Sequence, residues 1–430
     1  MKTKDCAVKT ENRFYGNYEK ISAALSGFAS KKITLPLFII LAFLGSTLTV
    51  YLSGYKYFGL DVHIATYQFF LCDYSVGFCS RLLVGAIITH FTDTVSGELI
   101  RTVINTAVMF TLAAQSCAAG TVIRTALKRK NIPVTLLTLV FVFSPLGLTE
   151  NMVMPGTLDV YILALFLIWL AFYPTPVIYF ITPPVCLAAM AIHYEFLFTC
   201  LPPMLVLLMY KGAFADKKTT AAAAWTSFGV SSAVSAGSFF WFVFLAKDHL
   251  KMTADDYYYR MLARLDIDPA VRSANMYQLR GTPIYKDYFD YYIFGKYEGR
   301  DHYENTGDFF SFLKNYTVHN TDWKQFEQQL KLFIPVLAVF CLIWFLCMRR
   351  TKGIQRFVFF CCAAQSLVLV PELIISTDTW RWVSGAFIAQ FAVFFAVYYD
   401  RRSVLNGSLI KKKRRQAAAG LCEEEAQCRE

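Results

Sequence analysis

Apolar stretches long enough to cross a lipid bilayer recur along almost the whole of this 430-residue chain. A hydrocarbon core of about 30 Å is spanned by about 20 apolar residues in a helix. In lipid the backbone N–H and C=O groups must be satisfied internally, so stretches this long and apolar are predicted to be helices. Charged residues make up 17% of the chain, against about 25% in soluble domains. An ordinary soluble fold is therefore excluded.

Hydropathy and helix breakers together predict ten transmembrane helices, and the expected fold class is an all-α, polytopic transmembrane bundle. The predicted spans are 33–52, 99–123, 133–149, 158–173, 176–192, 195–210, 221–246, 332–348, 357–376 and 382–399. Residues 1–32 are polar and lack the apolar core of a signal peptide, so we expect the first span to be retained as an anchor.

The distribution of Lys and Arg predicts the orientation of the bundle. With the N-terminus inside, the N-tail, the C-tail and the intervening inner segments hold 26 Lys and Arg residues. The short outer segments hold only Lys56, Arg81 and Arg381. Lys and Arg are enriched in cytoplasmic loops, so both termini are predicted to be cytoplasmic in a multi-pass protein of the inner or plasma membrane. The net charge of +11 is then a topology signal, and no nucleic-acid partner is expected.

The predicted organisation has five parts. A cytoplasmic N-tail (1–32) precedes helices one to seven (33–246), which include a first outer loop at 53–98; a large outer loop (247–331), helices eight to ten (332–399) and a basic C-tail (400–430) follow. The apolar patches of the first outer loop are too short to cross, so we expect a structured loop on the membrane, with two half-spans as the alternative. The large outer loop is nearly neutral and rich in aromatic residues, and it is predicted to form a small, mainly helical cap.

Ionisable residues at membrane depth are costly and are therefore candidates for function. Here they gather at the outer ends of the predicted spans, in three short blocks. The blocks hold Asp73 with Arg81, His193 with Glu195, and Asp378 with Arg381; Asp61 lies nearby in the first outer loop. Each block also has a purely structural explanation: a local Asp73–Arg81 salt bridge, a hairpin tip facing water, and an interfacial aromatic belt.

Other kinds of site are poorly represented in the sequence. Cys72 and Cys79 lie in an outer segment where they could pair, but no Cys/His cluster indicates a metal. The phosphate-binding, dinucleotide-binding, serine-hydrolase and zinc-protease motifs are absent. An ATP-driven pump contained in this chain alone is therefore disfavoured.

The layout resembles that of the GT-C class of membrane glycosyltransferases and the related O-antigen and exopolysaccharide polymerases. The resemblance rests on a cytoplasmic N-terminus, a long first outer loop with an acid after the first span, and a large later outer loop. The strings DYSVGFCSRLLVG, AIHYEFLFTCLPP and STDTWRW are also similar to blocks in a family of bacterial polytopic proteins. The tandem acidic pair of protein O-mannosyltransferases and the WWD-type motif of oligosaccharyltransferases are both missing.

The resemblance implies inverting sugar transfer outside the membrane, from a polyprenyl-linked sugar donor to a glycan or lipid acceptor. It makes Asp73 the general base, with Asp61 as second choice. Arg81 and Arg381 would neutralise the departing phosphate, and the residues that orient sugar or phosphate would be His193, Glu195 and Asp378. No cofactor is implied, and a divalent metal only if the donor is a diphosphate. The alternatives are a lipid or lipid-linked glycan transporter, a membrane acyl- or phosphotransferase, and a non-catalytic assembly partner.

Overall fold

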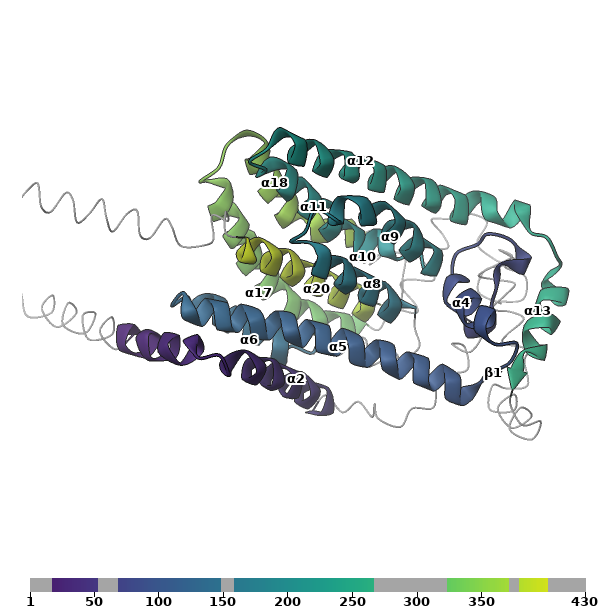
Figure 1. The fold of residues 1–430 in the computed structure, drawn as a ribbon, viewed down its shortest axis with the longest axis horizontal. Coiled ribbons are helices and arrows are strands. Elements are labelled where there is room, and N and C mark those ends of the chain that lie inside the picture. The colour runs from purple at the N-terminus through teal and green to yellow at the C-terminus, as the bar shows by residue number, and fades with distance from the viewer. Residues whose placement is uncertain (1–17, 53–68, 148–157, 267–322, 371–378, 401–430) are drawn as a thin grey trace, which may run out of the picture. The chain divides into compact units, whose positions relative to one another are not determined.

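The structure, a computed structural model, describes residues 18–52, 69–147, 158–266, 323–370 and 379–400. Within these ranges the chain is mostly helical, and several of its helices are apolar enough to span a membrane (Figure 1). The predicted fold class is confirmed at this level. The chain divides into two compact units, and each is described by itself.

The lengths of the apolar helices set how many of them could cross a bilayer. Four helices in the described ranges are long and apolar enough: Gly97–Lys128, Lys218–Leu245, Leu330–Met348 and Arg381–Tyr399. A fifth span results if Tyr18–Ser30 and Thr34–Thr49 are counted together across a bend of 104°. The other predicted spans contain apolar helices of 10–17 residues. At 1.5 Å per residue, a 12-residue helix reaches only about 18 Å, which is less than the hydrocarbon thickness.

The first unit comprises Met1–Ile168, Ala188–Tyr194 and Phe239–Phe312. Its elements are α2 (Thr34–Leu52), η1 (Tyr74–Val76), α4 (Leu83–Phe91), β1 (Val95–Ser96), α5 (Gly97–Lys128), α6 (Ile132–Phe143), most of α8 (Asp159–Phe172), the end of α9 (Ile178–Ile192), η2 (Trp241–Leu245), η3 (Ala246–His249), α13 (Ala254–Ala263) and β2 (Leu265–Asp266).

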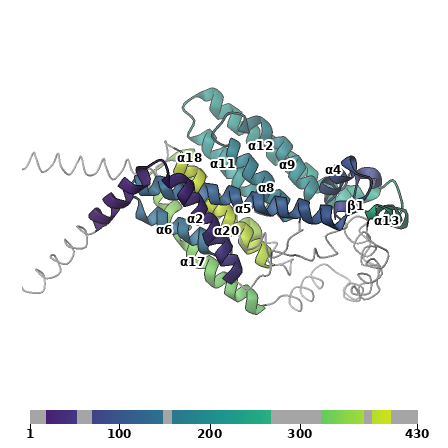
Figure 2. The ribbon, with the colours of Figure 1, turned by 60° about the horizontal axis from the view of Figure 1, so that its bottom comes forward.

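The long helix α5 is delimited by its end residues and holds α2 against one side. Ser96 caps its N-terminus by accepting a hydrogen bond from the Leu99 N–H at 3.1 Å. Helix α2 packs along α5 (Figures 1 and 2). Their backbones approach so closely at Gly120 that an added Cβ would lie 2.7 Å from the Ile39 nitrogen. A small residue at the crossing is the usual condition for close packing of membrane helices.

Part of the predicted first outer loop packs against η2 and the start of the predicted large outer loop. The loop contains the short apolar helix α4, and strand β1 follows it. β1 pairs in parallel with β2, which places Val95 opposite Leu265. The Trp241 indole N–H donates to the Phe78 carbonyl at 2.8 Å, and the Lys251 N–H donates to the Val76 carbonyl at 2.8 Å. The described parts of the two predicted outer loops, together with η2, thus form one folded assembly.

The second unit comprises Trp169–Leu187, Glu195–Ser238 and Leu313–Glu430. It contains α10 (Phe196–Thr199), α11 (Leu201–Ala213), most of α12 (Lys218–Phe240), α17 (Trp323–Met348), α18 (Gly353–Ala364), η4 (Gln365–Leu369) and α20 (Thr379–Tyr399). Its core is aromatic: the rings of Trp344 and Phe359 stack at 6.0 Å, and Phe340 meets Phe391 edge-on at 4.8 Å. Gln390, buried among them, donates to the Ser366 hydroxyl at 2.9 Å and accepts from the Trp344 indole at 3.3 Å.

The contact at Gly120 gives a test of the first unit's packing. We expect Gly120→Ala to destabilise the protein by about 1–3 kcal/mol, because the new methyl group must push α2 away from α5. Gly229→Ala in α12 is the matched control, since nothing lies within 4 Å of a Cβ at that position. Unfolding in mixed micelles, followed by circular dichroism during SDS titration, measures both. Equal stability of the two variants would contradict the close α2–α5 contact.

Candidate functional site

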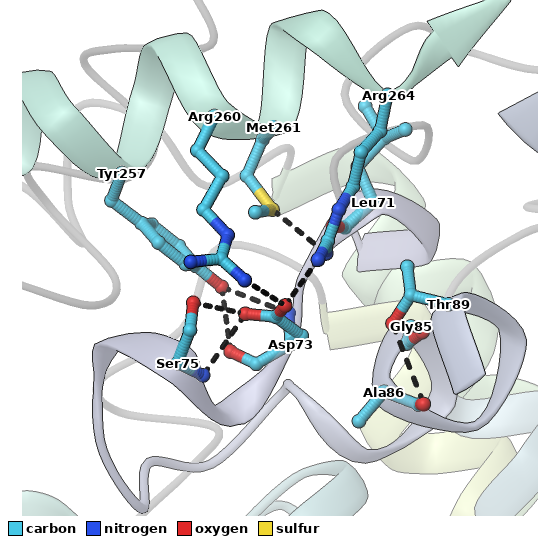
Figure 3. Close-up of polar contacts among 10 residues, drawn as sticks. All are labelled: Leu71, Asp73, Ser75, Gly85, Ala86, Thr89, Tyr257, Arg260, Met261 and Arg264. Carbon is cyan, nitrogen blue, oxygen red and sulfur yellow. Dashed lines mark hydrogen bonds and ion pairs between the residues drawn. The ribbon is translucent and has the colours of Figure 1, made fainter. Parts of the chain in front are cut away.

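Asp73 lies at the centre of the polar contacts between the two predicted outer loops (Figure 3). It is the N-cap of η1, and its Oδ1 accepts hydrogen bonds from the Ser75 N–H at 3.0 Å and from the Ser75 hydroxyl. Its Oδ2 pairs with the guanidinium of Arg264 at 2.5 Å and with that of Arg260 at 3.4 Å. The Arg264 side chain is 18% exposed and that of Arg260 48%. The Arg264 contact is therefore the less screened and stronger of the two.

Tyr257 fixes the backbone of Asp73 from the same helix, α13. Its hydroxyl accepts from the Asp73 N–H at 3.1 Å and donates to the Asp73 carbonyl at 2.9 Å. Arg264 also donates to the Leu71 carbonyl at 3.3 Å. We call these contacts of Asp73 with Tyr257, Arg260 and Arg264 the Asp73 clamp. The clamp holds both the backbone and the carboxylate of Asp73 in one position.

The clamp also controls how readily Asp73 takes up a proton. Burial raises its pKa, but hydrogen bonds from Ser75 and Arg264 outweigh burial and hold the pKa below the ordinary value of 3.8. A carboxylate with a lowered pKa is a weaker base. The hydrogen bonds from Ser75 and the ion pair with Arg264 therefore weaken Asp73 as a general base.

Arg81 is a buried cation with an unusual backbone. Its side chain is 7% exposed, and its φ of 73° lies in the left-handed region, which costs a non-glycine residue free energy. The Arg81 N–H donates to the Ala191 carbonyl at 2.9 Å, and the neighbouring Ser80 hydroxyl donates to the Met190 carbonyl at 2.9 Å. These bonds attach the loop to the C-terminal end of α9 and so hold the strained conformation.

The side chain of Arg81 contacts the His193–Glu195 block. Its guanidinium donates to the Tyr194 hydroxyl at 3.1 Å and lies 5.2 Å from the centre of that ring, a cation–π contact. The His193 ring packs on the Tyr194 ring at 4.8 Å. The first and second predicted blocks therefore meet through Arg81 and Tyr194.

In the second unit, Glu195 pairs with Arg381. The two side chains meet at 2.9 Å, and Glu195 is 4% exposed. A buried pair of this kind is costly to break, because the remaining charge is left in a site of low dielectric. The pairing joins one residue of the second predicted block to one of the third.

The structure thus pairs the sequence-predicted residues in an unexpected way. The local Asp73–Arg81 salt bridge considered as a structural explanation is replaced by pairing of Asp73 with Arg264 and Arg260. Asp61 and Asp378 lie outside the described residues.

The clamp residues Tyr257, Arg260 and Arg264 were not among the site residues predicted from the sequence. Their spacing is a signal that could have found them: positions i and i+3 place Tyr257 and Arg260 on one face of α13, and Arg264 follows directly after the helix ends at Ala263. In the sequence they stand within a loop of mixed charge, where a single face is not evident.

Neither a disulfide nor a metal site emerges from the described cysteines. Cys72 and Cys79 are buried thiols and are not joined; burial raises the pKa of the Cys72 thiol to about 12 and that of Cys79 to about 11. Such thiols are poor nucleophiles. Among the described residues, no group of three or more His, Cys, Asp or Glu side chains is placed to hold a metal ion.

Comparison with known proteins adds no relative: no family model, no curated protein and no solved structure matches the chain.

The clamp makes a prediction about stability and pH. In a double-mutant cycle, Asp73→Asn and Arg264→Gln should show a coupling of about 1–3 kcal/mol, and Asp73→Asn with the more exposed Arg260→Gln a smaller one. The pKa of Asp73 is lower in the folded chain than its ordinary 3.8. The contribution of the ionised Asp73 carboxylate to the free energy of unfolding is therefore complete above pH 3.8. It is lost as the pH falls through the lower pKa of the folded state.

Unfolding in mixed micelles across this acidic range measures the effect. Wild type and Asp73→Asn should differ at neutral pH and converge in acid. A difference that stays constant as the pH falls would show that the charge of Asp73 does not stabilise the clamp.

The backbone of Arg81 makes a second prediction. Arg81→Gly and Arg81→Ala both remove the guanidinium, but only alanine must still adopt the left-handed conformation. We expect the glycine variant to be the more stable of the two by about 1 kcal/mol. The same SDS titration measures the difference, and an alanine variant as stable as the glycine variant would show that residue 81 does not retain a positive φ in solution.

Proposed function

We propose that the chain is an integral membrane glycosyltransferase or polysaccharide polymerase that uses a polyprenyl-linked sugar donor at the extracytoplasmic face. In this proposal the ten apolar helical segments cross or line the membrane, with both termini in the cytoplasm. The shorter helices would then be accommodated by local thinning of the bilayer or by flanking side chains that reach up to the interface. The excess of Lys and Arg in the inner segments supports this orientation.

The observation that carries the proposal is the position of Arg81. A buried guanidinium in a costly backbone conformation is the kind of local strain that gathers at functional sites. Arginine presents planar, paired N–H donors that fit a phosphate group, and its charge is insensitive to pH. A preorganised cation of this kind stabilises the charge that develops on a departing phosphate. We assign Arg81 to the phosphate of the donor.

The remaining residues receive supporting roles. Tyr194 fixes the Arg81 guanidinium by its hydroxyl and ring, and the adjacent His193 is proposed to orient the sugar or phosphate. Arg381, whose guanidinium donates to the Glu195 carboxylate, is proposed as a second contact for the phosphate and has its own variant in the test below. Asp378 is proposed to orient the sugar or the phosphate.

The general base remains a choice between two acids. Asp73 is the first candidate, although hydrogen bonds from Ser75 and the pairing with Arg264 lower its pKa and make it a weaker base. Asp61 is the second candidate.

A transporter of lipid-linked glycans is the rival function. It is favoured by the polar side chains at Ser227, Ser231 and Ser235, which are buried along one face of α12. Alternating access requires polar groups near the midplane of the membrane. Such small residues, however, equally promote close helix packing, and a transporter would move a labelled glycolipid between leaflets without forming a glycosidic bond.

The test of the proposal is sugar transfer by purified protein in proteoliposomes. The substrates are a radiolabelled polyprenyl-phosphate sugar and a glycan acceptor, and the variants are Arg81→Gly, Arg381→Ala, Asp73→Asn and Asp61→Asn. We expect Arg81→Gly to lower transfer at least 100-fold while remaining folded, since loss of one preorganised partner costs about 10²–10³ in rate. Loss of transfer in only one of the two aspartate variants identifies the base.

The matched control is an ion pair in the first turns of α17 that has no proposed role. Glu327 and Lys331 form an exposed i, i+4 pair, and Glu327→Gln should leave transfer unchanged. Wild-type transfer by both Arg81→Gly and Arg381→Ala would overturn the mechanism. Glycolipid translocation without transfer would establish the transporter instead.

A further inference from the structure

A short helix precedes α2 in the chain and is not part of the apolar span that α2 forms. Residues Tyr18–Ser30 form a helix that meets the first apolar helix, Thr34–Thr49, at an angle of 104°. Figure 2 shows the bend between these two purple segments. The turn between them is short and carries Lys31 and Lys32, both exposed.

This angle is fixed by contacts with α5. The Ser26 hydroxyl donates to the Lys128 carbonyl at 3.1 Å. The guanidinium of Arg124 donates to the Ala29 carbonyl at 3.2 Å and to the Lys31 carbonyl at 3.3 Å. Ala29 is fully buried against Ile123 and Leu127 of α5. The helix is therefore held in place, with one side docked and the rest of its surface outward.

The outward surface of the helix is amphipathic. Tyr18, Ile21, Leu25 and Phe28 are all exposed, although they are large and apolar. Their spacing of i, i+3, i+7 and i+10 places them along one stripe of a helix. Lys20 and Gly27 are exposed on a different face. An apolar stripe beside a polar face is the pattern of helices that lie in a membrane interface.

The neighbouring helix shows what contacts this stripe. Residues Ile40, Leu41, Leu44 and Leu48 of α2 are exposed along the length of a helix that is almost wholly apolar, so they face lipid acyl chains. A helix joined to such a segment by a short turn, and nearly perpendicular to it, runs along the plane of the membrane at the end of the span. Its apolar stripe then meets the boundary between headgroups and acyl chains.

We propose that Tyr18–Ser30 is an interfacial helix that seats its apolar stripe in one leaflet of the membrane and binds anionic phospholipid headgroups through Lys20, Lys31 and Lys32. The positive charges at the bend and on the polar face complement a leaflet that carries negative charge. In the topology proposed above this is the cytoplasmic leaflet. The inference itself depends only on the bend, the docking contacts and the exposed stripe.

The test places a nitroxide-bearing unnatural amino acid at Leu25, on the stripe, or at Gly27, on the polar face, in the full chain. Gly27 is a suitable control because nothing lies within 4 Å of a Cβ there. The protein is reconstituted in vesicles of phosphatidylcholine with phosphatidylglycerol. Electron paramagnetic resonance then compares the accessibility of each label to oxygen, which partitions into lipid, and to a water-soluble nickel complex.

We expect the oxygen-to-nickel ratio to be several-fold higher at Leu25 than at Gly27, and to fall at Leu25 in vesicles of phosphatidylcholine alone. High nickel accessibility at both positions would show a helix in water and overturn the proposal. High oxygen accessibility at both would show a broken span or re-entrant segment and overturn it as well. Equal ratios in the two vesicle types would overturn the assignment of the lysines to anionic headgroups.

Hydrogen exchange gives an independent measurement that needs no label. Amides of Tyr18–Ser30 should exchange at least tenfold more slowly in nanodiscs of the anionic mixture than in the Ile21→Asp/Leu25→Asp variant, whose stripe cannot enter the leaflet. The Gly27→Ala variant keeps the stripe and all three lysines, has free space for the added methyl group, and should retain the protection. Protection that is equal in the aspartate variant and the wild type would mean that docking on α5 alone holds the helix.

Discussion

Backbone hydrogen bonding without water is the constraint on which the rest of this molecule depends. In an apolar surrounding the chain can satisfy its N–H and C=O groups only within helices, and the described residues are accordingly mostly helical. Polar side chains on these helices obey the same rule. Thr138 donates to the Val134 carbonyl one turn back at 2.8 Å, and the Gln390 amide is satisfied by Ser366 and the Cys362 carbonyl. These residues gain hydrogen bonds at no cost to the helix ladder.

Within the described residues, the assembly formed by the two predicted outer loops contains backbone where this rule is relaxed. There the backbone turns at Gly77, whose φ of 134° suits glycine, and an added Cβ would lie 3.2 Å from the His249 carbonyl oxygen. Irregular backbone needs partners of its own, and the Asp73 clamp provides them from α13 and from Arg264 just after it. In the same assembly Arg81 has a strained backbone and its guanidinium contacts the Tyr194 hydroxyl. The loop that holds Asp73 and Arg81 is therefore kept in place by side-chain hydrogen bonds and ion pairs rather than by helix propensity.

The sequence predicted where helices lie much better than which charges meet. The range 99–123 falls inside α5, Gly97–Lys128, because hydropathy is a local property of the chain. The partner of Asp73 is not local: Arg264 stands 191 residues away, and spacing along the chain carries no information about such a pair. Pairing of Glu195 with Arg381 is likewise set by tertiary structure, although both residues were candidates. The lengths of the helices were predicted less well than their positions. Helix α6, for example, ends at Phe143, but mean hydropathy over a window stays high past this residue, so the predicted span ran to 149.

The long separation between the two halves of the clamp has a consequence for how the protein is made. Chains fold and insert in the order of synthesis, so Asp73 leaves the ribosome long before Tyr257 and Arg264 exist. Until α13 has been translated, the η1 loop has neither the ion pair nor the tyrosine bridge that later hold it. Formation of the clamp therefore waits for synthesis of a segment 191 residues behind Asp73, while α17, α18 and α20 are still to be made.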